Sequence, residues 1–463
     1  MPKSATAPQQ PILIDASSIR AYLERQRPPT PSAGRLATIV VYLWVLLLTS
    51  SDIKNITALY VHWWALVPLL VCLFPTLLRA KWRIDLSILF SGLFFTAAVM
   101  IAGWEDPKYA AEQAGKLAVI CIGSFLLFQQ FPGLARTGFT AIRHSVYLNT
   151  ALLASMAIFP GFAAWQMAPG RWGTVLNTPG SLWRVGIITL VYGAYLVYVE
   201  RPFSFRGFLL FGCSCFLIYA DGSRTAMFLI PLSVVYLALV LLRETRNHMD
   251  TLRLAALVIL GVFAAGLMLD ARSRMFGTYS DTADALTRIT QFSDEFSSEG
   301  AYGLAYSDPV RYEMVRLTLE QIKSQPFFGK GIGSTRINTP AGPMVVHMSY
   351  LQLWADLGIF GLLSFLWVTC GWTPRLRRAF NAVRNYSSPR ERALYYNAVF
   401  VLIFFVFSGC FHPVSTEWPE WIAFAVALGF FTELVAPKQS GQKRVFAIVR
   451  GDGPLPAGMY DRN

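Results

Sequence analysis

The sequence predicts an all-α polytopic membrane protein with about twelve transmembrane helices and one large helical loop on the outer side. The chain has 463 residues, of which 54% are hydrophobic and only 14% are charged, whereas about a quarter of the residues in a soluble domain are charged. The apolar residues form long blocks rather than alternating patterns. Blocks of about 18 to 22 residues match a hydrocarbon core of about 30 Å at a rise of about 1.5 Å per residue.

Twelve of these blocks are candidate spans, and they divide the chain into five parts. We expect the spans at 36–50, 58–78, 84–103, 114–131, 141–159, 183–199, 206–220, 224–242, 251–269, 347–372, 393–411 and 418–435. The five parts are an N-terminal tail (1–35), nine spans (36–269), a large loop with amphipathic helices (270–346), three spans (347–435) and a C-terminal tail (436–463). The first tail is polar and proline-rich, so we expect no cleaved signal peptide.

Lysine and arginine accumulate in the cytoplasmic loops of membrane proteins, and this bias predicts the orientation. With the N-terminus inside, the inner segments hold 26 of the 40 basic residues, the short outer loops hold six and the large loop holds eight. We therefore expect both termini to be cytoplasmic and the large loop to face outward. The formal charge of +13 follows from the same bias, and no basic helix outside the spans indicates a nucleic-acid partner.

The large loop is predicted to be structured near its end. Residues 309–325 form an amphipathic pattern that Pro326 terminates. The apolar residues expected near one face of this helix are Val310, Met314, Leu317 and Ile322. The glycine-rich segment Gly329–Gly333 has neither the P-loop nor the dinucleotide-binding pattern. We expect it to be flexible or sharply bent, so that the chain can re-enter the membrane at His347.

His347 stands out among the five histidines because it follows the large loop and opens the tenth expected span. The positive end of a helix disfavours a cationic histidine, so His347 would be neutral near pH 7 and available as a general base. The alternative is a half-buried, hydrogen-bonded histidine at the membrane interface. His62 and His412 also lie at outer ends of expected spans.

Arg224 is a candidate for binding an anion. It follows the expected tight turn Asp221-Gly222 and the possible helix cap Ser223, so it falls in the first turn of the eighth span. A positive helix end beside an arginine is a good phosphate site. The alternative is an arginine that extends to the lipid headgroups.

Arg311 and Arg316 form a second basic group on the loop helix, and Lys330 follows it. Basic residues on the outer side have no topological role, which favours an anionic ligand. The alternative is a solvated helix face on which the arginines pair with Glu313 and Glu320.

Metal and nucleophile chemistry have little support in the sequence. The outer acidic residues have no convincing ligand spacing with a histidine, and no nucleophile motif is present. The six cysteines lie in or beside apolar blocks without zinc-ligand spacing. We expect no metal and no disulfide framework.

Four motifs follow one another in a specific order. They are Asp221-Gly-Ser-Arg224, Asp308-Pro-Val-Arg311, Gln325-Pro-Phe-Phe-Gly-Lys-Gly-Ile-Gly333 and His347-Met-Ser-Tyr-Leu-Gln-Leu-Trp-Ala-Asp-Leu-Gly-Ile-Phe-Gly-Leu-Leu363. This order resembles the O-antigen ligase family and its relatives, the O-antigen polymerases and the protein O-oligosaccharyltransferases. The close resemblance covers residues 305–365. Met348 stands where the family often has asparagine.

The resemblance implies a GT-C-like glycosyltransferase in the bacterial inner membrane that acts on the periplasmic face. Such a ligase transfers O-antigen polysaccharide from undecaprenyl diphosphate to lipid A–core, by inversion and without a cofactor. Its implied partners are this donor, this acceptor and membrane lipids. The catalytic residues implied are His347, Arg224 and Arg311, and the substrate-binding residues are Arg316, Tyr312, Lys330, Gly331, Gly333 and Tyr350.

Two alternatives stay open. An O-antigen polymerase or a protein O-oligosaccharyltransferase would use the same donor, although a single large outer loop and a short C-terminal tail favour the ligase. A transporter or flippase without catalysis is the other alternative. Against it, we see neither an internal repeat nor a pair of broken helices in the sequence.

Overall fold

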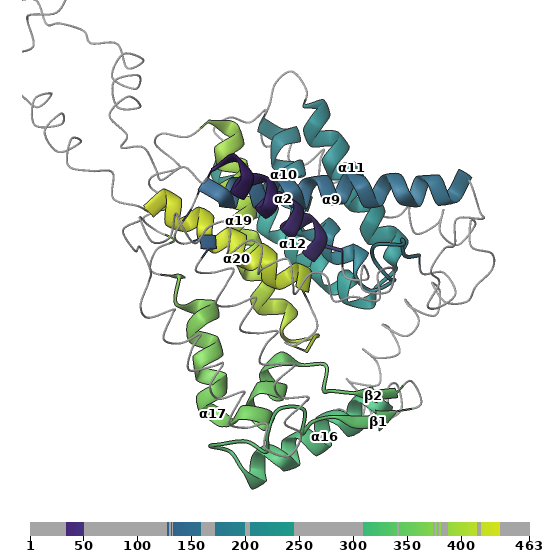
Figure 1. The fold of residues 1–463 in the computed structure, drawn as a ribbon, viewed down its shortest axis with the longest axis vertical. Coiled ribbons are helices and arrows are strands. Elements are labelled where there is room, and N and C mark those ends of the chain that lie inside the picture. The colour runs from purple at the N-terminus through teal and green to yellow at the C-terminus, as the bar shows by residue number, and fades with distance from the viewer. Residues whose placement is uncertain are drawn as a thin grey trace, which may run out of the picture. The chain divides into compact units, whose positions relative to one another are not determined.

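The computed structural model describes residues 34–50, 127–128, 131, 133–158, 172–199, 204–244, 309–339, 342–373, 376, 379–380, 388–413 and 418–435. Its helices are α2 (Arg35–Leu48), α9 (Gly133–Ile158), α10 (Leu182–Val199), α11 (Phe205–Asp221), α12 (Arg224–Glu244), α16 (Pro309–Ser324), α17 (Ser349–Cys370), α19 (Pro389–Ser408) and α20 (Trp418–Val435) (Figure 1). Strands β1 (Ile337–Thr339) and β2 (Gly342–Met344) form an antiparallel hairpin with Ile337 opposite Met344. The described part is thus mostly helical, with one small hairpin that the sequence did not predict.

Three described helices, α10, α17 and α19, are long and apolar enough to cross a membrane, and α2 is apolar but shorter. Helices α11, α12 and α20 coincide with the predicted seventh, eighth and twelfth spans, whereas α9 begins well before the predicted fifth span. The predicted spans 58–78, 84–103 and 251–269, and most of 114–131, lie outside the described residues. The number of twelve spans, the five-part division and the GT-C-like fold therefore stay predictions.

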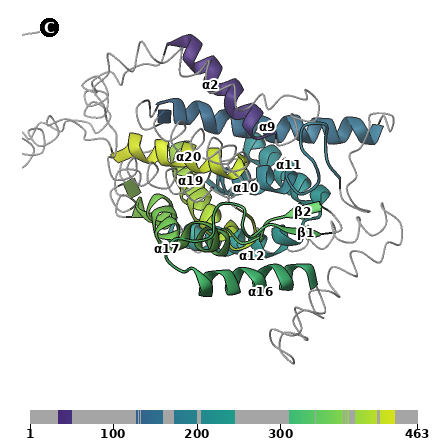
Figure 2. The same cartoon turned by 60° about the horizontal axis from the view of Figure 1, so that its bottom comes forward.

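Helix α10 lies at the centre of the packed helices. It contacts α9, α11, α12, α19 and α20, and its residues from Leu182 to Leu196 are all buried. A Cβ atom at Gly186 would lie 2.7 Å from the Ser214 carbonyl oxygen, and one at Gly193 would lie 2.8 Å from the Phe211 nitrogen. These glycines allow α10 and α11 to pack backbone against backbone, as small residues do between membrane helices. Helix α2 packs against α9 and crosses it obliquely (Figure 2).

The helix ends meet in two groups. In the first, the Arg136 guanidinium of α9 donates to Glu433 near the end of α20 at 2.9 Å and to Glu391 near the start of α19 at 3.2 Å. In the second, Arg184 at the start of α10 contacts Glu420 at the start of α20. The first group joins ends predicted to be inner, and the second joins ends predicted to be outer. The contacts therefore agree with the predicted alternation of helix directions.

Helix α17 is broken at Gly358, which the sequence did not predict. Gly358 has φ 71° and ψ −176°. The rings of Tyr350 and Phe365, on either side of the break, lie 6.0 Å apart, whereas fifteen residues of straight helix would separate them by about 22 Å. The helix also begins at Ser349, so His347 precedes it. The predicted uninterrupted span from 347 is corrected on both points.

Helix α16 confirms the predicted loop helix, and of the four apolar residues expected near one face only Leu317 is exposed. Its buried residues are Met314, Thr318, Gln321 and Ile322, whereas Leu317 is 37% exposed. The prediction of Leu317 on the buried face is wrong because polar side chains occupy that face. The Gln321 amide nitrogen donates to the Ala355 carbonyl of α17 at 3.0 Å and to the Ser334 hydroxyl, so burying it leaves its donor satisfied.

Candidate functional site

The glycine-rich segment after α16 is held against the break in α17. The break leaves two α17 carbonyls without helical partners, and they accept hydrogen bonds from the segment instead. The Lys330 nitrogen donates to the Ala355 carbonyl and the Gly331 nitrogen to the Asp356 carbonyl, each at 3.0 Å. In return, the Ile359 nitrogen of α17 donates to the Pro326 carbonyl at 2.9 Å. The segment and the broken helix therefore satisfy each other's backbone groups.

The buried Asp356 carboxylate fixes the rest of the segment. It accepts hydrogen bonds from the Gly333 nitrogen at 2.9 Å, the Ser334 hydroxyl at 2.9 Å and the Thr335 nitrogen at 3.2 Å. Gly329, Gly331 and Gly333 have φ of 70°, 109° and 83°, which favours glycine. The predicted sharp bend is therefore confirmed, and hydrogen bonds hold it in place.

A second group of side chains lies where the ends of α10, α19 and α20 meet. The Arg184 Nε donates to the Glu420 carboxylate at 2.8 Å, and both side chains are about 5% exposed or less. The Ser408 hydroxyl donates to the other Glu420 oxygen at 2.7 Å. The Asp221 carboxylate accepts from the Gly180 and Trp183 nitrogens and so caps the start of α10. This capping fixes the helix end from which Arg184 extends.

His412, in the turn between α19 and α20, is joined to this ion pair. Its Nδ1 lies 3.0 Å from an Arg184 Nη2 atom. Arginine has only donors, so Nδ1 must accept, and the proton of neutral His412 is on Nε2. Burial, followed by the electrostatic effects of Arg184, His347 and Arg311, lowers the pKa of His412 to about 2. His412 is therefore neutral at physiological pH.

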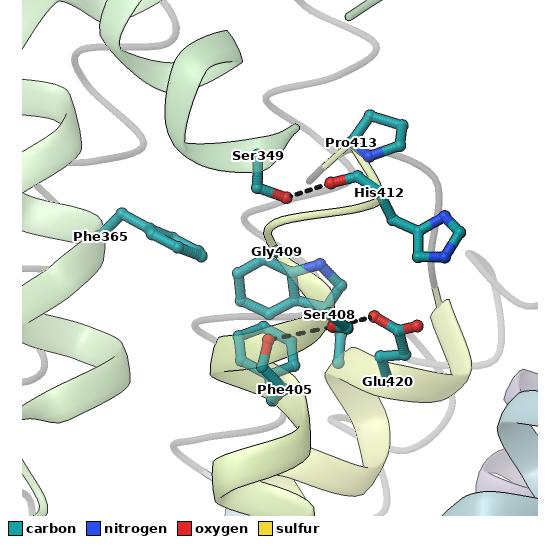
Figure 3. Close-up of a pocket in the computed structure, with 9 residues that line it drawn as sticks. Ser349, Phe365, Phe405, Ser408, Gly409, His412, Pro413 and Glu420 are labelled. Atoms are coloured by element: carbon teal, nitrogen blue, oxygen red, sulfur yellow. Dashed lines mark hydrogen bonds between the residues drawn. The ribbon is translucent and has the colours of Figure 1, made fainter. Parts of the chain in front are cut away.

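The segment that carries His347 is fastened beside His412. The Ser349 hydroxyl donates to the His412 carbonyl at 2.5 Å, and the Ser349 nitrogen donates to the Gly409 carbonyl at 2.8 Å. Figure 3 shows Ser349 pointing to the His412 backbone and Ser408 pointing to Glu420. A small pocket lies here, lined by Ser349, Phe365, Phe405, Ser408, Gly409, His412, Pro413, Glu420 and Trp421. The start of α17 thus forms one wall of this pocket.

Residues 209–366 match a family model described as O-antigen ligase. Over this segment the chain is similar to the O-antigen ligase family. The predicted resemblance is confirmed and extends back into α11, so it covers Arg224, Arg311 and His347. Members of the family are membrane enzymes that act on lipid-linked glycans. Together with the apolar helices, the match identifies an integral membrane protein. No curated protein sequence matches the chain.

The O-antigen ligase resemblance implies three catalytic residues. Two of them, His347 and Arg311, interact electrostatically with the His412 side chain. His347 is half-buried at a bend between β2 and α17, and Arg311 is exposed in the first turn of α16. Both lower the pKa of His412. The structure therefore brings Arg311, His347 and His412 within electrostatic reach of one another.

Arg224 begins α12, as predicted. The turn before it is also confirmed, because Gly222 ends α11 with a left-handed φ of 62°. The Ser223 carbonyl accepts from the Ala226 nitrogen and so starts the helix. The orientation of the Arg224 side chain lies outside what the structure describes.

Arg316 matches the alternative expectation of a solvated and paired face. Its guanidinium donates to Glu313 at 2.6 Å and to Glu320 at 3.2 Å, and all three side chains are exposed. The hydrogen bond from Arg316 lowers the pKa of Glu313. Tyr312, on the same helix, is half-buried. A substrate-binding role for these two residues stays a prediction.

The remaining predicted substrate-binding residues differ in whether their hydrogen-bonding groups already bond within the protein. The Gly331 and Gly333 nitrogens both donate to Asp356, so their backbone donors serve the fold. The Tyr350 hydroxyl donates to the Val406 carbonyl at 2.5 Å. Lys330 is exposed beside them, and its side chain stays a candidate.

Sequence reasoning did not single out Arg184 and Glu420. Each is a charged residue near the start of an apolar block, and charge within a span indicates function. That signal was present, because Arg184 is one of the six basic residues counted at the outer ends. What the sequence could not show is that these two charges, far apart along the chain, pair with each other beside His412.

Proposed function

We propose that the protein is an O-antigen ligase. It transfers O-antigen polysaccharide from undecaprenyl diphosphate to a sugar hydroxyl of lipid A–core, on the periplasmic face of the bacterial inner membrane, with both termini in the cytoplasm. The observation that carries this proposal is the match of residues 209–366 to the O-antigen ligase family model, because this segment contains Arg224, Arg311 and His347. The charge bias assigns these three residues to the outer side of the membrane.

The transfer is a single displacement at the anomeric carbon. The acceptor hydroxyl oxygen forms a bond to this carbon while the bond from the carbon to the phosphate oxygen breaks. His347 takes the hydroxyl proton, and undecaprenyl diphosphate leaves with the electron pair. The anomeric configuration is inverted, since no covalent glycosyl-enzyme forms. A positioned general base contributes about 10²- to 10⁴-fold to such a step.

Arg311 and Arg224 stabilise the negative charge that grows on the leaving diphosphate. Charged donors placed where charge develops lower the barrier, and removing one donor from such a site typically costs about 10²- to 10³-fold in rate. Guanidinium groups bind phosphate oxygens in pairs of hydrogen bonds. With two arginines in this role, the proposed reaction needs no metal ion.

Reconstituted transfer tests the proposal. Purified protein in lipid vesicles would receive lipid-linked O-antigen and lipid A–core without any ion gradient, and the product would be measured by gel mobility and mass spectrometry. We expect His347→Ala and Arg311→Ala to lose transfer by about 10²-fold or more. Lys323→Ala is the matched control, because Lys323 is an exposed cation on the same helix as Arg311 and should retain activity.

Changing the acceptor molecule, or adding a chelator, distinguishes the alternative functions. Transfer only to a second O-antigen chain would identify a polymerase, and transfer only to a peptide would identify a protein-directed enzyme. Either result, or normal transfer by His347→Ala, would overturn the ligase proposal. Loss of transfer with a chelator would overturn its metal-independent form. Glycan movement across the vesicle without transfer would identify a transporter.

A further inference from the structure

Beside His347 lies a second histidine whose orientation and proton are fixed by buried neighbours. We infer that His412 donates a hydrogen bond from Nε2 to an oxygen of the donor's diphosphate, and that Arg184 and Glu420 are the positioning residues that hold it for this role. This inference rests on the proposed function, because it assigns a further binding residue to the same site.

The contacts around His412 leave its ring little freedom. Glu420 holds Arg184 at 2.8 Å, and Arg184 holds the ring nitrogen Nδ1 of His412 at 3.0 Å. The guanidinium also donates to the Gly180 carbonyl and lies 4.9 Å from the centre of the Trp183 ring. That indole lies in turn against His412, with ring centres 5.7 Å apart. The ring is therefore held both at its edge and over its face.

The same contacts determine which proton His412 can offer. Because Nδ1 accepts from Arg184, the remaining N–H of the neutral ring is on Nε2. A second proton would have to sit on Nδ1, directly against a guanidinium. His412 is therefore a poor base, so it cannot replace His347 in taking the proton of the acceptor hydroxyl. Its chemistry in the site is that of a neutral donor.

The surrounding charge favours an anionic acceptor for this donor. The guanidinium groups of Arg184 and Arg311 act on His412 as positive charges. Among the described residues, the Glu420 carboxylate is paired with Arg184 and accepts from Ser408. The Asp221 carboxylate accepts from the Gly180 and Trp183 nitrogens. A diphosphate oxygen gains from this field, whereas a neutral sugar hydroxyl does not. Of the two substrates, the donor is thus the one that His412 contacts.

Donor kinetics of three variants test the inference. Gln can place an amide N–H near the position of Nε2 but cannot act as a base, so His412→Gln should keep the donor KM within about threefold of wild type. His412→Ala and His412→Phe lack the donor. Both should raise the donor KM about 10- to 100-fold, the value of one hydrogen bond to a charged group, with the acceptor KM unchanged. Phe retains the ring volume against Trp183, so it serves if the alanine variant does not fold.

A separate experiment tests the positioning role of Arg184 and Glu420. Glu420→Gln should raise the donor KM in the same direction as His412→Ala, and adding Glu420→Gln to His412→Ala should cause no further rise. A merely structural Glu420 would lower thermal stability without this non-additivity in KM. An unchanged donor KM in His412→Ala and His412→Phe would overturn the inference, as would a His412→Gln variant that behaves like the alanine variant.

Binding of undecaprenyl diphosphate without a glycan separates this inference from the proposed function. Binding to the folded full-length protein in nanodiscs can be measured even if no transfer occurs. If binding weakens in His412→Ala but not in His412→Gln, the inference stands although the wild type fails to glycosylate lipid A–core. If wild-type transfer occurs but binding is equal in all variants, the inference fails and the ligase proposal stands.

Discussion

Gly358→Ala is expected to destabilise the link between α17 and the glycine-rich segment. The backbone at Gly358 has φ 71° and ψ −176°, a region that is essentially restricted to glycine. A Cβ atom there would lie 2.0 Å from the Phe327 carbonyl oxygen. Since that neighbour is backbone, it cannot rotate away, and either the helix break or the segment must move.

The expected loss of unfolding free energy in Gly358→Ala has two causes. Backbone strain of this kind costs about 1–3 kcal/mol. If the segment moves, it also loses the hydrogen bonds that join Pro326, Lys330 and Gly331 to α17, each with a net value of about 0.5–1.5 kcal/mol. We expect a total loss of about 3–5 kcal/mol of unfolding free energy from these two causes.

Thermal unfolding of the purified protein in detergent is the assay, combined with limited proteolysis near residue 330. Gly212→Ala is the matched control, because nothing lies within 4 Å of a Cβ atom at Gly212 in α11, and Ala favours a helix over Gly by about 1 kcal/mol. We expect Gly358→Ala to lower Tm and speed cleavage, and Gly212→Ala to leave both unchanged or raise Tm. Equal Tm and cleavage rates in the two variants would refute the proposed coupling of the two glycine motifs.

Three further predictions concern buried charges. Asp356→Asn should lower Tm, because its amide would place a donor against N–H and O–H groups that now donate to a carboxylate. Asp356→Glu with wild-type Tm would contradict this tight fit. Arg184→Met should cost about 3–5 kcal/mol by leaving Glu420 buried and unpaired, and Arg184→Met with Glu420→Gln should recover part of the loss in a thermal-shift measurement. Stability should fall as the pH drops below about 6.5, where His412 protonates only in the unfolded state, by at most about 1.4 kcal/mol per pH unit. His412→Gln should show a shallower dependence in pH-dependent unfolding, and an identical slope would argue against a buried neutral His412.

Features that depend on local composition could be predicted from the sequence. Helix α20 has the bounds expected from its apolar block, and α12 begins at Arg224 because a turn with Gly222 precedes it. The bend at Gly329–Gly333 was predicted because several glycines lie close together. Spans, turns and caps are each set by residues that are neighbours in the chain.

Features that depend on distant residues could not be predicted. Gly358 looks like an ordinary glycine in an apolar run, and only the approach of Phe327 makes its backbone conformation necessary. The face of α16 was misjudged at Leu317, because Gln321 is buried only where Ala355 and Ser334 accept from it. Tertiary hydrogen bonds overrode the apolar pattern in both places.

The sequence by itself determined the membrane class, the expected sidedness and the order of Arg224, Arg311 and His347, since these follow from composition, charge bias and motif order. The tertiary structure alone decided that Arg184 and Glu420 pair beside His412. The physical reason is that a buried charge is stable only with a partner, and the partner of Arg184 comes from a helix more than two hundred residues away.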